Sequence, residues 1–378
     1  MRIAVVPIIR DHPWGAPGHC MGALVESLLG AGHEVLWFVA PIDWENPAVK
    51  RLEHLGAMAR PLPDGDFPTF VRLVKLRRRI WELSRGSRQL KSQLREFRPE
   101  HIFLNQAGTW CGLGAELFEV LAEYPDRYSL ICHLNQAAAP FVGSGLDRAR
   151  SVMRRARTVF FNSSWTWRLA ERQIAESIPN AATFQYPVRF AFGEPLAWPE
   201  NRVPRLAMVN RLDTHQKGID LALEAIAGLK AEGIETRLSI FGSGPERDYL
   251  GDLARFLGID GVVSFEGYSE DLESVWSEHE MMLLPSRYEG LGVAMIEAMG
   301  FGRPVLRTPL GGSEEWIRDG DTGFLCPGAE TDLLLETLRR ALLQRRDWPE
   351  MGRRANRLVR ESLDPDPARV FLSALDAR

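Results

Sequence analysis

Residues 281–299 read MMLLPSRYEGLGVAMIEAM and predict a buried strand, a glycine-containing turn and a helix. The uninterrupted apolar run 281–284 is typical of a short strand that is covered on both faces. Residues 291–300 predict the helix. The glycines between them leave backbone N–H groups free at the start of that helix, where the helix dipole favours an anion such as phosphate. The stretch therefore predicts one strand–turn–helix unit of a parallel sheet, with an anion site at its turn.

The same alternation of strand and helix extends in both directions along the chain. In the second half we expect strands at 206–210, 237–241, 262–266 and 304–307, with helices at 219–231, 245–257 and 269–279. In the first half we expect strands at 3–7, 34–40, 101–104, 128–132 and 158–161, with helices at 21–29 and 70–97. This pattern predicts the α/β class, with two Rossmann-like doubly wound domains that face each other across a cleft.

A stretch rich in proline interrupts this rhythm and suggests the domain boundary. We expect a first domain over 1–192, a linker over 193–204 and a second domain over 205–355. The final segment, 356–378, is expected to pack back on the first domain.

Composition excludes several classes of protein. The 378 residues are 45% hydrophobic and 25% charged, which excludes collagen-like, coiled-coil and mostly disordered chains. No apolar run approaches the roughly 20 residues that span a bilayer. The four cysteines form no C-x-x-C pair, which favours a reducing, cytoplasmic location.

Charge is distributed unevenly between the two halves. Residues 1–190 hold 24 basic and 18 acidic residues, whereas the remainder holds 22 and 32. The stretch 72–98 is basic and amphipathic. It predicts either a helix that contacts an anionic membrane peripherally or a helix whose charged face is solvated. Nucleic-acid binding is not expected, because no recognised module is present and the pI is about 6.1.

Two loops of the second half carry candidate binding groups. Arg211 and Lys217 lie between a predicted strand and a predicted helix, where two cations could neutralise a diphosphate or remain solvated surface charges. Gly242 and Gly244 form a turn that allows a ligand to approach the backbone, or that serves packing alone. This turn lacks the G-x-G-x-x-G pattern, so a nicotinamide site is not supported.

Two carboxylates, Glu289 and Glu297, stand eight residues apart around the turn of the first quoted stretch. A nucleotide-diphosphate sugar has hydroxyl groups at both ends and phosphates in the middle. One carboxylate could accept hydrogen bonds from the sugar and the other from the ribose, with the glycines holding the diphosphate between them.

With these motifs the sequence resembles the retaining GT-B fold glycosyltransferases of family GT4 (glycosyltransferase group 1). The shared features are the E-x7-E spacing of Glu289 and Glu297 and the R-x5-K-G of residues 211–218. GGSEE at 311–315 and DGDTGF at 319–324 also match. The resemblance covers about residues 205–326 and extends to the first half only in architecture.

The resemblance implies a role for each matching residue. Arg211 and Lys217 would stabilise the leaving diphosphate, Glu289 would bind a donor-sugar hydroxyl, and Glu297 would bind the ribose. The remaining contacts implied are the N–H groups of Gly290, Leu291 and Gly292 to the phosphates, and Gly242, Gly244 and Tyr268 near the base.

Two points of the first half also match the family's architecture. Gly15 and Gly18 lie where the family places a loop that closes on donor and acceptor. His133 follows a predicted strand at a position near the reacting sugar; the alternative is a histidine whose hydrogen bonds are satisfied at a strand end. By placement alone, the Asn-Gln pairs at 105–106 and 135–136 could bind acceptor hydroxyls.

The function expected is transfer of a hexose-type sugar from a nucleotide-diphosphate sugar to a glycan, lipid-linked or small-molecule acceptor. The resemblance implies retention by front-face substitution. No cofactor or metal is expected, because the D-x-D sequences at 64–66 and 319–321 do not follow apolar strands. The alternatives are a phosphorylase or sugar-nucleotide epimerase of the same fold, and a non-catalytic nucleotide-sugar-binding protein.

Overall fold

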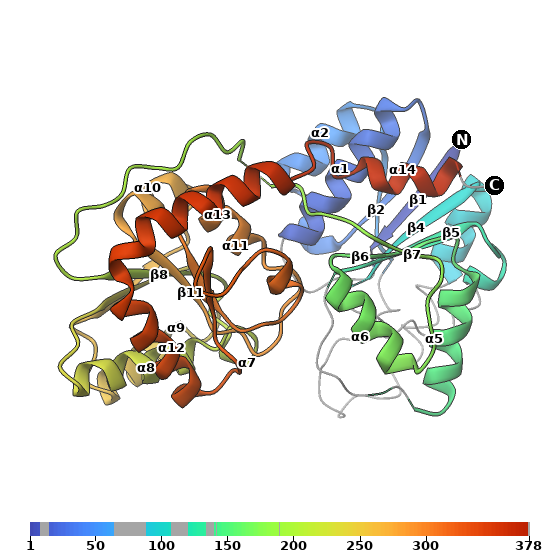
Figure 1. The fold of residues 1–378 in the computed structure, drawn as a ribbon. Coiled ribbons are helices and arrows are strands. Elements are labelled where there is room, and N and C mark those ends of the chain that lie inside the picture. Colours follow the sequence, from blue (N-terminus) through green and yellow to red (C-terminus); the bar gives the residue numbers. More distant parts are fainter. Residues whose placement is uncertain are drawn as a thin grey trace. The chain divides into compact units, whose positions relative to one another are not determined.

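The computed structural model describes residues 1–7, 15–63, 88–106, 120–133, 140, 142–188 and 190–376 (Figure 1). The chain forms two compact units. One comprises Met1–Pro187 with Asp364–Arg378, and the other comprises Val188–Leu363. The crossing between the units therefore falls before the linker that we expected at 193–204. The return crossing falls after residue 356, where we expected the final segment to begin.

The first unit is built on a parallel sheet with the strand order β3-β2-β1-β4-β5-β6-β7. Its strands are β1 (Arg2–Pro7), β2 (Glu34–Val39), β3 (Met58–Pro61), β4 (His101–Gln106), β5 (Tyr128–Cys132), β6 (Val159–Phe161) and β7 (Ala181–Thr183). Its helices include α1 (Ala16–Gly30), α2 (Pro47–His54), α5 (Ser144–Arg155), α6 (Ser164–Ile174) and α14 (Arg369–Asp376). The strands β1, β2, β4 and β5 are almost continuously buried, as expected for a sheet covered on both faces.

The second unit contains a parallel sheet with the strand order β10-β9-β8-β11-β12-β13. Its strands are β8 (Arg205–Val209), β9 (Arg237–Phe241), β10 (Val263–Gly267), β11 (Met281–Leu284), β12 (Val305–Arg307) and β13 (Gly323–Leu325). Its helices are α7 (Thr214–Lys217), α8 (Ile219–Ala231), α9 (Arg247–Phe256), α10 (Leu272–Glu278), α11 (Val293–Gly300), α12 (Thr331–Leu343) and α13 (Trp348–Ser362). The strand order changes direction between β8 and β11, which makes this the topological switch point of the sheet.

Two expectations about helices differ from the structure. We expected a loop over Gly15–Gly18, but α1 already begins at Ala16 and has a proline in its first turn. Proline fits that position because its missing N–H would be unsatisfied there anyway. Of the basic helix expected over 70–97, residues 88–97 are helical and residues 64–87 lie outside the described part of the chain.

The stretch expected as a linker is held against the second unit. Leu196 N donates to Phe301 O at 3.2 Å. The buried guanidinium of Arg303 donates to the carbonyl oxygen of Ala197 at 2.7 Å and to that of Leu196 at 3.3 Å. These contacts explain why this proline-rich stretch belongs to the second unit.

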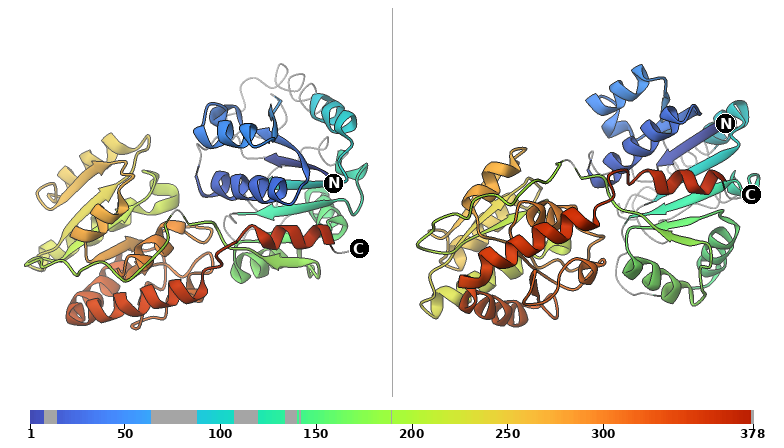
Figure 2. Two further views of the ribbon diagram at one scale, coloured as in Figure 1. Left: turned by 90° about the horizontal axis from the view of Figure 1, so that it is seen from above. Right: turned by 45° about the horizontal axis from the view of Figure 1, so that its top comes forward.

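The last helix returns to the first unit. In Figures 1 and 2 the red helix α14 lies alongside α1 and the sheet of the first unit. Within the described residues, no helix combines the length and the hydropathy needed to cross a membrane.

Candidate functional site

The candidate site of the second unit lies at the switch point between β8 and β11. These strands are parallel neighbours, with Met282 aligned with Ala207. The loop after β8 carries Arg211 and Lys217, and the loop after β11 carries Glu289. Because ligands of doubly wound sheets bind beyond the carboxyl ends of the strands at such a point, the topology brings the predicted residues to the expected place.

Lys217 and Glu289 form a largely buried ion pair. Lys217 Nζ donates to Glu289 Oε2, and the two side chains are 16% and 9% exposed. The Ser286 hydroxyl also donates to Glu289 Oε2, at 3.4 Å. Burial alone raises the pKa of Glu289, but Lys217, Arg307 and the Ser286 hydrogen bond outweigh it, so the pKa lies below its usual value. Glu289 is therefore ionised at neutral pH.

Arg211 lies on the same loop as Lys217 but has different partners. Its Nη2 donates to Asp213 Oδ2 at 2.8 Å and to Gln216 Oε1 at 2.9 Å. Asp213 also caps α7, because its Oδ1 accepts from Gln216 N at 3.1 Å. The cap and the ion pair together hold the Arg211 side chain beside the start of α7.

Arg287 joins the two loops and was missed by the sequence analysis. Its guanidinium donates to both carboxylate oxygens of Asp220, at 2.8 and 2.7 Å, and to Thr214 O at 2.6 Å. Its backbone N–H donates to Gln216 O at 2.8 Å. The bidentate contact fixes the loop of Glu289 relative to α8, and the bonds to Thr214 O and Gln216 O fix it relative to α7, which carries Lys217.

Close backbone contacts also hold these loops together. Gly311 has φ +62°, and a Cβ there would overlap the carbonyl oxygen of Gly290. Gly218 has φ +65°, and a Cβ there would overlap the carbonyl oxygen of Pro285. At both positions glycine is required by sterics and by backbone conformation.

The helix α11 follows the loop of Glu289. It begins at Val293, after Gly292 in the left-handed conformation at φ 78°. Leu291 is 3% exposed, and Glu297 is buried within α11 at 5% exposure. The backbone of residues 290–292 therefore lies at the N-terminus of α11, where an anion is favoured. The role of Glu297 towards a ribose stays a prediction.

A buried arginine, Arg307, lies behind this loop and was also missed. It ends β12 and is 0% exposed. Its Nη1 donates to Leu291 O at 2.8 Å, its Nη2 to Leu310 O at 2.8 Å and its Nε to Thr308 O at 3.2 Å. Burial lowers the pKa of Arg307 to about 10, so it stays charged at neutral pH. The signal in the sequence is a charge at the end of an otherwise apolar strand, which fits a solvated strand end equally well.

The glycine turn after β9 packs on the loop after β8. Gly242 has φ +136°, and a Cβ there would overlap the carbonyl oxygen of Asn210; at Gly244 a Cβ would overlap that of Leu212. This turn therefore serves packing, which was one of its two interpretations. Tyr268, which follows β10, is 66% exposed. A role of these residues towards a base stays a prediction.

His133 belongs to the first unit and lies in a buried network there. Its Nε2 hydrogen-bonds Asn105 Oδ1, and its Nδ1 lies 2.8 Å from the Tyr186 hydroxyl. Because the amide oxygen accepts, Nε2 carries the proton and Nδ1 accepts from Tyr186. Burial lowers the pKa of His133 to about 3. The side chain has both nitrogens satisfied and is 2% exposed, which fits the interpretation of a satisfied histidine.

The other predicted groups of the first unit have different environments. Gly15 precedes α1 and Gly18 lies within its first turn. The buried Gln106 donates from Nε2 to Cys132 Sγ at 3.1 Å. Residues 135–136 and 64–66 lie outside the described part of the chain. Asp319, of the other D-x-D sequence, accepts two hydrogen bonds of 2.7 Å from Arg340.

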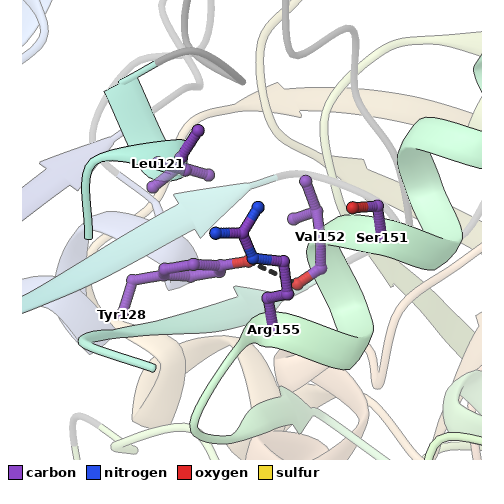
Figure 3. A pocket seen from close by; sticks show the side chains of 6 residues that line it. Leu121, Tyr128, Ser151, Val152 and Arg155 are labelled. Carbon is purple, nitrogen blue, oxygen red and sulfur yellow. Dashed lines mark hydrogen bonds between the residues drawn. The ribbon is translucent and has the colours of Figure 1, made fainter. Parts of the chain in front are cut away.

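A small pocket of the first unit holds none of the predicted site residues. Figure 3 shows Leu121, Tyr128, Ser151, Val152 and Arg155 around it. The Tyr128 hydroxyl donates to Val152 O at 2.6 Å across this region. This hydrogen bond thus joins two residues that line the pocket.

Comparison with known proteins agrees with this geometry. Residues 196–358 match the family of glycosyl transferases group 1. The alpha-D-kanosaminyltransferase of Streptomyces kanamyceticus is 33% identical over 158 residues, which are 41% of this chain and 39% of that protein. The N-acetyl-alpha-D-glucosaminyl L-malate synthase of Bacillus anthracis is 31% identical over 145 residues, 38% of each chain. The chain thus spans about two fifths of the length of these curated relatives.

The fold extends beyond the matched region. The crystal structure of Anabaena Alr3699/HepE in complex with UDP and glucose superposes with a TM-score of 0.73 at 17% identity, and the match covers 100% of both chains. The architecture is therefore the GT-B fold, with one Rossmann-like sheet in each unit. The stretch that matches the glycosyl transferases group 1 family, residues 196–358, includes every predicted site residue of the second unit.

Proposed function

We propose that this chain is a retaining glycosyltransferase that moves a hexose-type sugar from a nucleotide-diphosphate sugar to an acceptor. The observation that carries the proposal is the Lys217–Glu289 pair, which stands at the β8–β11 switch point beside the backbone of residues 290–292. A cation and a helix N-terminus suit a diphosphate, and an adjacent carboxylate suits sugar hydroxyls. The Anabaena structure, which holds UDP and glucose in the same fold, supports this donor class.

Different residues would act on the diphosphate and on the sugar of the donor. Lys217 and Arg211 would offset the charge that develops on the departing diphosphate, together with the N–H groups of Gly290, Leu291 and Gly292. Glu289 would orient the sugar through its hydroxyls. We propose that this stabilisation needs no metal ion. The leaving phosphate would accept the proton of the acceptor hydroxyl on the face from which it departs, which retains the anomeric configuration.

The acceptor and the location are proposed more broadly. Glycans, lipid-linked sugars and small molecules all fit the transferase class. The basic stretch 72–98 supports a peripheral contact with an anionic membrane at which a lipid-linked acceptor would lie. Cys20, Cys132 and Cys326 are buried free thiols, which supports a reducing, cytoplasmic location.

Nucleotide binding tests the donor site directly. Thermal unfolding is followed with UDP, GDP, ADP and dTDP and their glucose derivatives, each with EDTA and with magnesium. At a concentration about 100 times its dissociation constant, a bound nucleotide stabilises the protein by about 2.7 kcal/mol. Lys217→Met should weaken binding by about 10–100-fold, because a hydrogen bond to a charged group contributes about 1.5–3 kcal/mol. Lys230→Met, at an exposed lysine of α8, is the matched control and should leave binding unchanged.

Glu289→Gln distinguishes the binding of the nucleotide diphosphate from the binding of the sugar. It frees Lys217 from its partner, so the nucleotide diphosphate should bind at least as well as to the wild type. The glucose derivative should lose the additional affinity that its sugar provides. If no nucleotide stabilises the wild type, the proposed donor site is wrong.

Turnover distinguishes the proposed reaction from its alternatives. The anomeric coupling constant of the product, measured by proton NMR, should show the configuration of the donor. Activity should persist in EDTA. A requirement for inorganic phosphate would indicate a phosphorylase, isomerisation without an acceptor would indicate an epimerase, and binding without turnover would indicate a binding protein.

A further inference from the structure

The proposed function assigns two residues that pair with each other to different groups of the donor. Lys217 and Glu289 are paired with each other. In the proposed function, on which this inference rests, Lys217 binds the diphosphate and Glu289 binds a sugar hydroxyl. Donor binding therefore draws Lys217 away from Glu289. A buried carboxylate that loses its counter-charge takes up a proton, because burial penalises the ionised form. A protonated Glu289 would be a weaker acceptor for the sugar.

Arg307 is placed to prevent this uptake. Its Nη1 lies 3.1 Å and the Glu289 Cγ lies 3.5 Å from the point where a Cβ on Gly292 would stand. The two side chains therefore approach the same point from two different elements, β12 and the loop after β11. The charged side chains that act on Glu289 within the described residues are Lys217 of α7 and Arg307 of β12, and Ser286 adds a hydrogen bond.

The hydrogen bonds of Arg307 keep it in place. Three backbone carbonyl oxygens, those of Leu291, Leu310 and Thr308, accept from its guanidinium, and Met295 Sδ lies 3.2 Å from Nη1. These partners occupy both nitrogens at the end of the fork as well as Nε. Lys217 ends a short helix and is partly exposed, whereas Arg307 is completely buried. An arginine also does not release its proton in proteins.

We propose that Arg307 is a positioning residue that keeps Glu289 ionised when Lys217 turns to the diphosphate. Glu289 thus has two cationic neighbours with different tasks. Lys217 is the counter-charge that the ligand recruits. Arg307 is the fixed counter-charge that stays with Glu289 and holds the loop over residues 290–292.

Proton exchange on binding tests this assignment. Calorimetry of UDP, GDP, ADP and dTDP at neutral pH, in buffers of different ionisation heat, gives the protons taken up with the nucleotide that binds. The wild type should take up none at Glu289. Arg307→Met should show an uptake that approaches one proton per nucleotide, because a single carboxylate titrates. Adding Glu289→Gln to Arg307→Met should remove that uptake.

Arg307→Lys is the conservative variant. It keeps the charge but loses the fork of backbone hydrogen bonds, so it should behave like the wild type in proton uptake even where its stability is lower. An uptake by Arg307→Lys equal to that of Arg307→Met would mean that the hydrogen bonds matter and the charge does not, which would overturn the proposal.

A second measurement does not require an Arg307 variant to fold. Lys217→Met reproduces the state in which Lys217 has left Glu289 while Arg307 remains. The unfolding midpoints of Lys217→Met and of Lys217→Met with Glu289→Gln are compared between about pH 6 and 8. Their difference should be independent of pH, because Glu289 stays ionised. If Arg307 does not suffice, Glu289 protonates in the folded state, and the stability of Lys217→Met relative to the double variant falls as the pH rises.

These outcomes separate the two proposals. If no nucleotide binds the wild type, the proposed function fails and this inference fails with it. If a nucleotide binds and Arg307→Met takes up no additional proton, the function stands and the role of Arg307 is wrong.

Discussion

At the scale of single residues, His101 and His133 of the first unit are buried and neutral. The pKa of each is lowered to about 3, by burial at both rings and, at His101, also by the nearby Arg157. His101 Nε2 lies 3.0 Å from the Ser129 hydroxyl, and His133 is enclosed by Asn105 and Tyr186. Protonating either ring in the folded state would leave a buried cation.

Acid should therefore destabilise the first unit. The folded pKa of about 3 lies below the unfolded value of about 6.5, so the unfolded state binds more protons between these values. Stability is complete above about pH 6.5 and falls as the pH decreases towards 3, by up to about 1.4 kcal/mol per pH unit for each histidine. The measurement is the unfolding free energy of the first unit between about pH 7 and 5.

Variants test whether the two histidine rings cause this dependence of the unfolding free energy on pH. His133→Gln should reduce the slope by about one histidine's share. His54→Gln, at an exposed histidine of α2, is the control and should leave the slope unchanged. A slope that His101→Gln and His133→Gln both leave intact would contradict the assignment.

At the scale of elements, the loops around the site depend on glycines with positive φ. Gly311 and Gly320 both adopt the left-handed conformation, with φ of +62° and +76°. Only Gly311 is in close backbone contact, because a Cβ at Gly320 would meet nothing within 4 Å. The two positions therefore separate conformational strain from steric overlap.

Gly320→Ala should cost about 1–2 kcal/mol of stability, which is the penalty of the left-handed conformation alone. Gly311→Ala should cost clearly more and should also weaken nucleotide binding, because it displaces the carbonyl of Gly290 and with it the loop over residues 290–292. Chemical denaturation and the nucleotide-induced thermal shift measure the two effects. Equal losses in the two variants would mean that the loops can separate without consequence.

Local sequence signals predicted some elements well and others poorly. The bounds of α8 are those expected, because Gly218 precedes a clear apolar periodicity that ends near Gly233. The start of α1 was placed too late, because Pro17 and Gly18 favour a loop by composition although proline is suited to a first helical turn. Composition does not distinguish a proline before a helix from one inside its first turn.

At the scale of the whole molecule, α14 packs into the core of the first unit, although most of that unit is formed by the first half of the sequence. Phe371 of α14 is 1% exposed and packs against three aromatic rings of the sheet region. The ring centroids lie 4.9 Å away for Phe160, 5.3 Å for Phe184 and 6.4 Å for Phe103. Phe184 in turn lies 5.5 Å from His133. The C-terminal helix thus completes the core around the histidine network.

Phe371→Ala should therefore destabilise the first unit by about 3–5 kcal/mol, as expected for a large aromatic side chain removed from a core. The unfolding transition of the second unit, identified by its shift with bound nucleotide, should be unaffected. Calorimetry resolves the two transitions. Leu343→Ala, at an exposed apolar residue of α12, is the control and should shift neither. A loss shared equally by both units would show that they unfold as one.

The sequence by itself determined the α/β class, the alternation of strands and helices, and the strand-end loops that carry Arg211, Lys217 and Glu289. These follow from periodicity, turn residues and short motifs, which are local. Only the tertiary structure decided that Lys217 pairs with Glu289, 72 residues away, and that Arg307 is buried behind the same loop. It also decided that His133 is enclosed and that Phe371 of α14 packs against Phe160 and Phe184. The physical reason is that strand order and packing, which no local signal encodes, select the neighbours of a side chain and hence its burial, its hydrogen bonds and its charge.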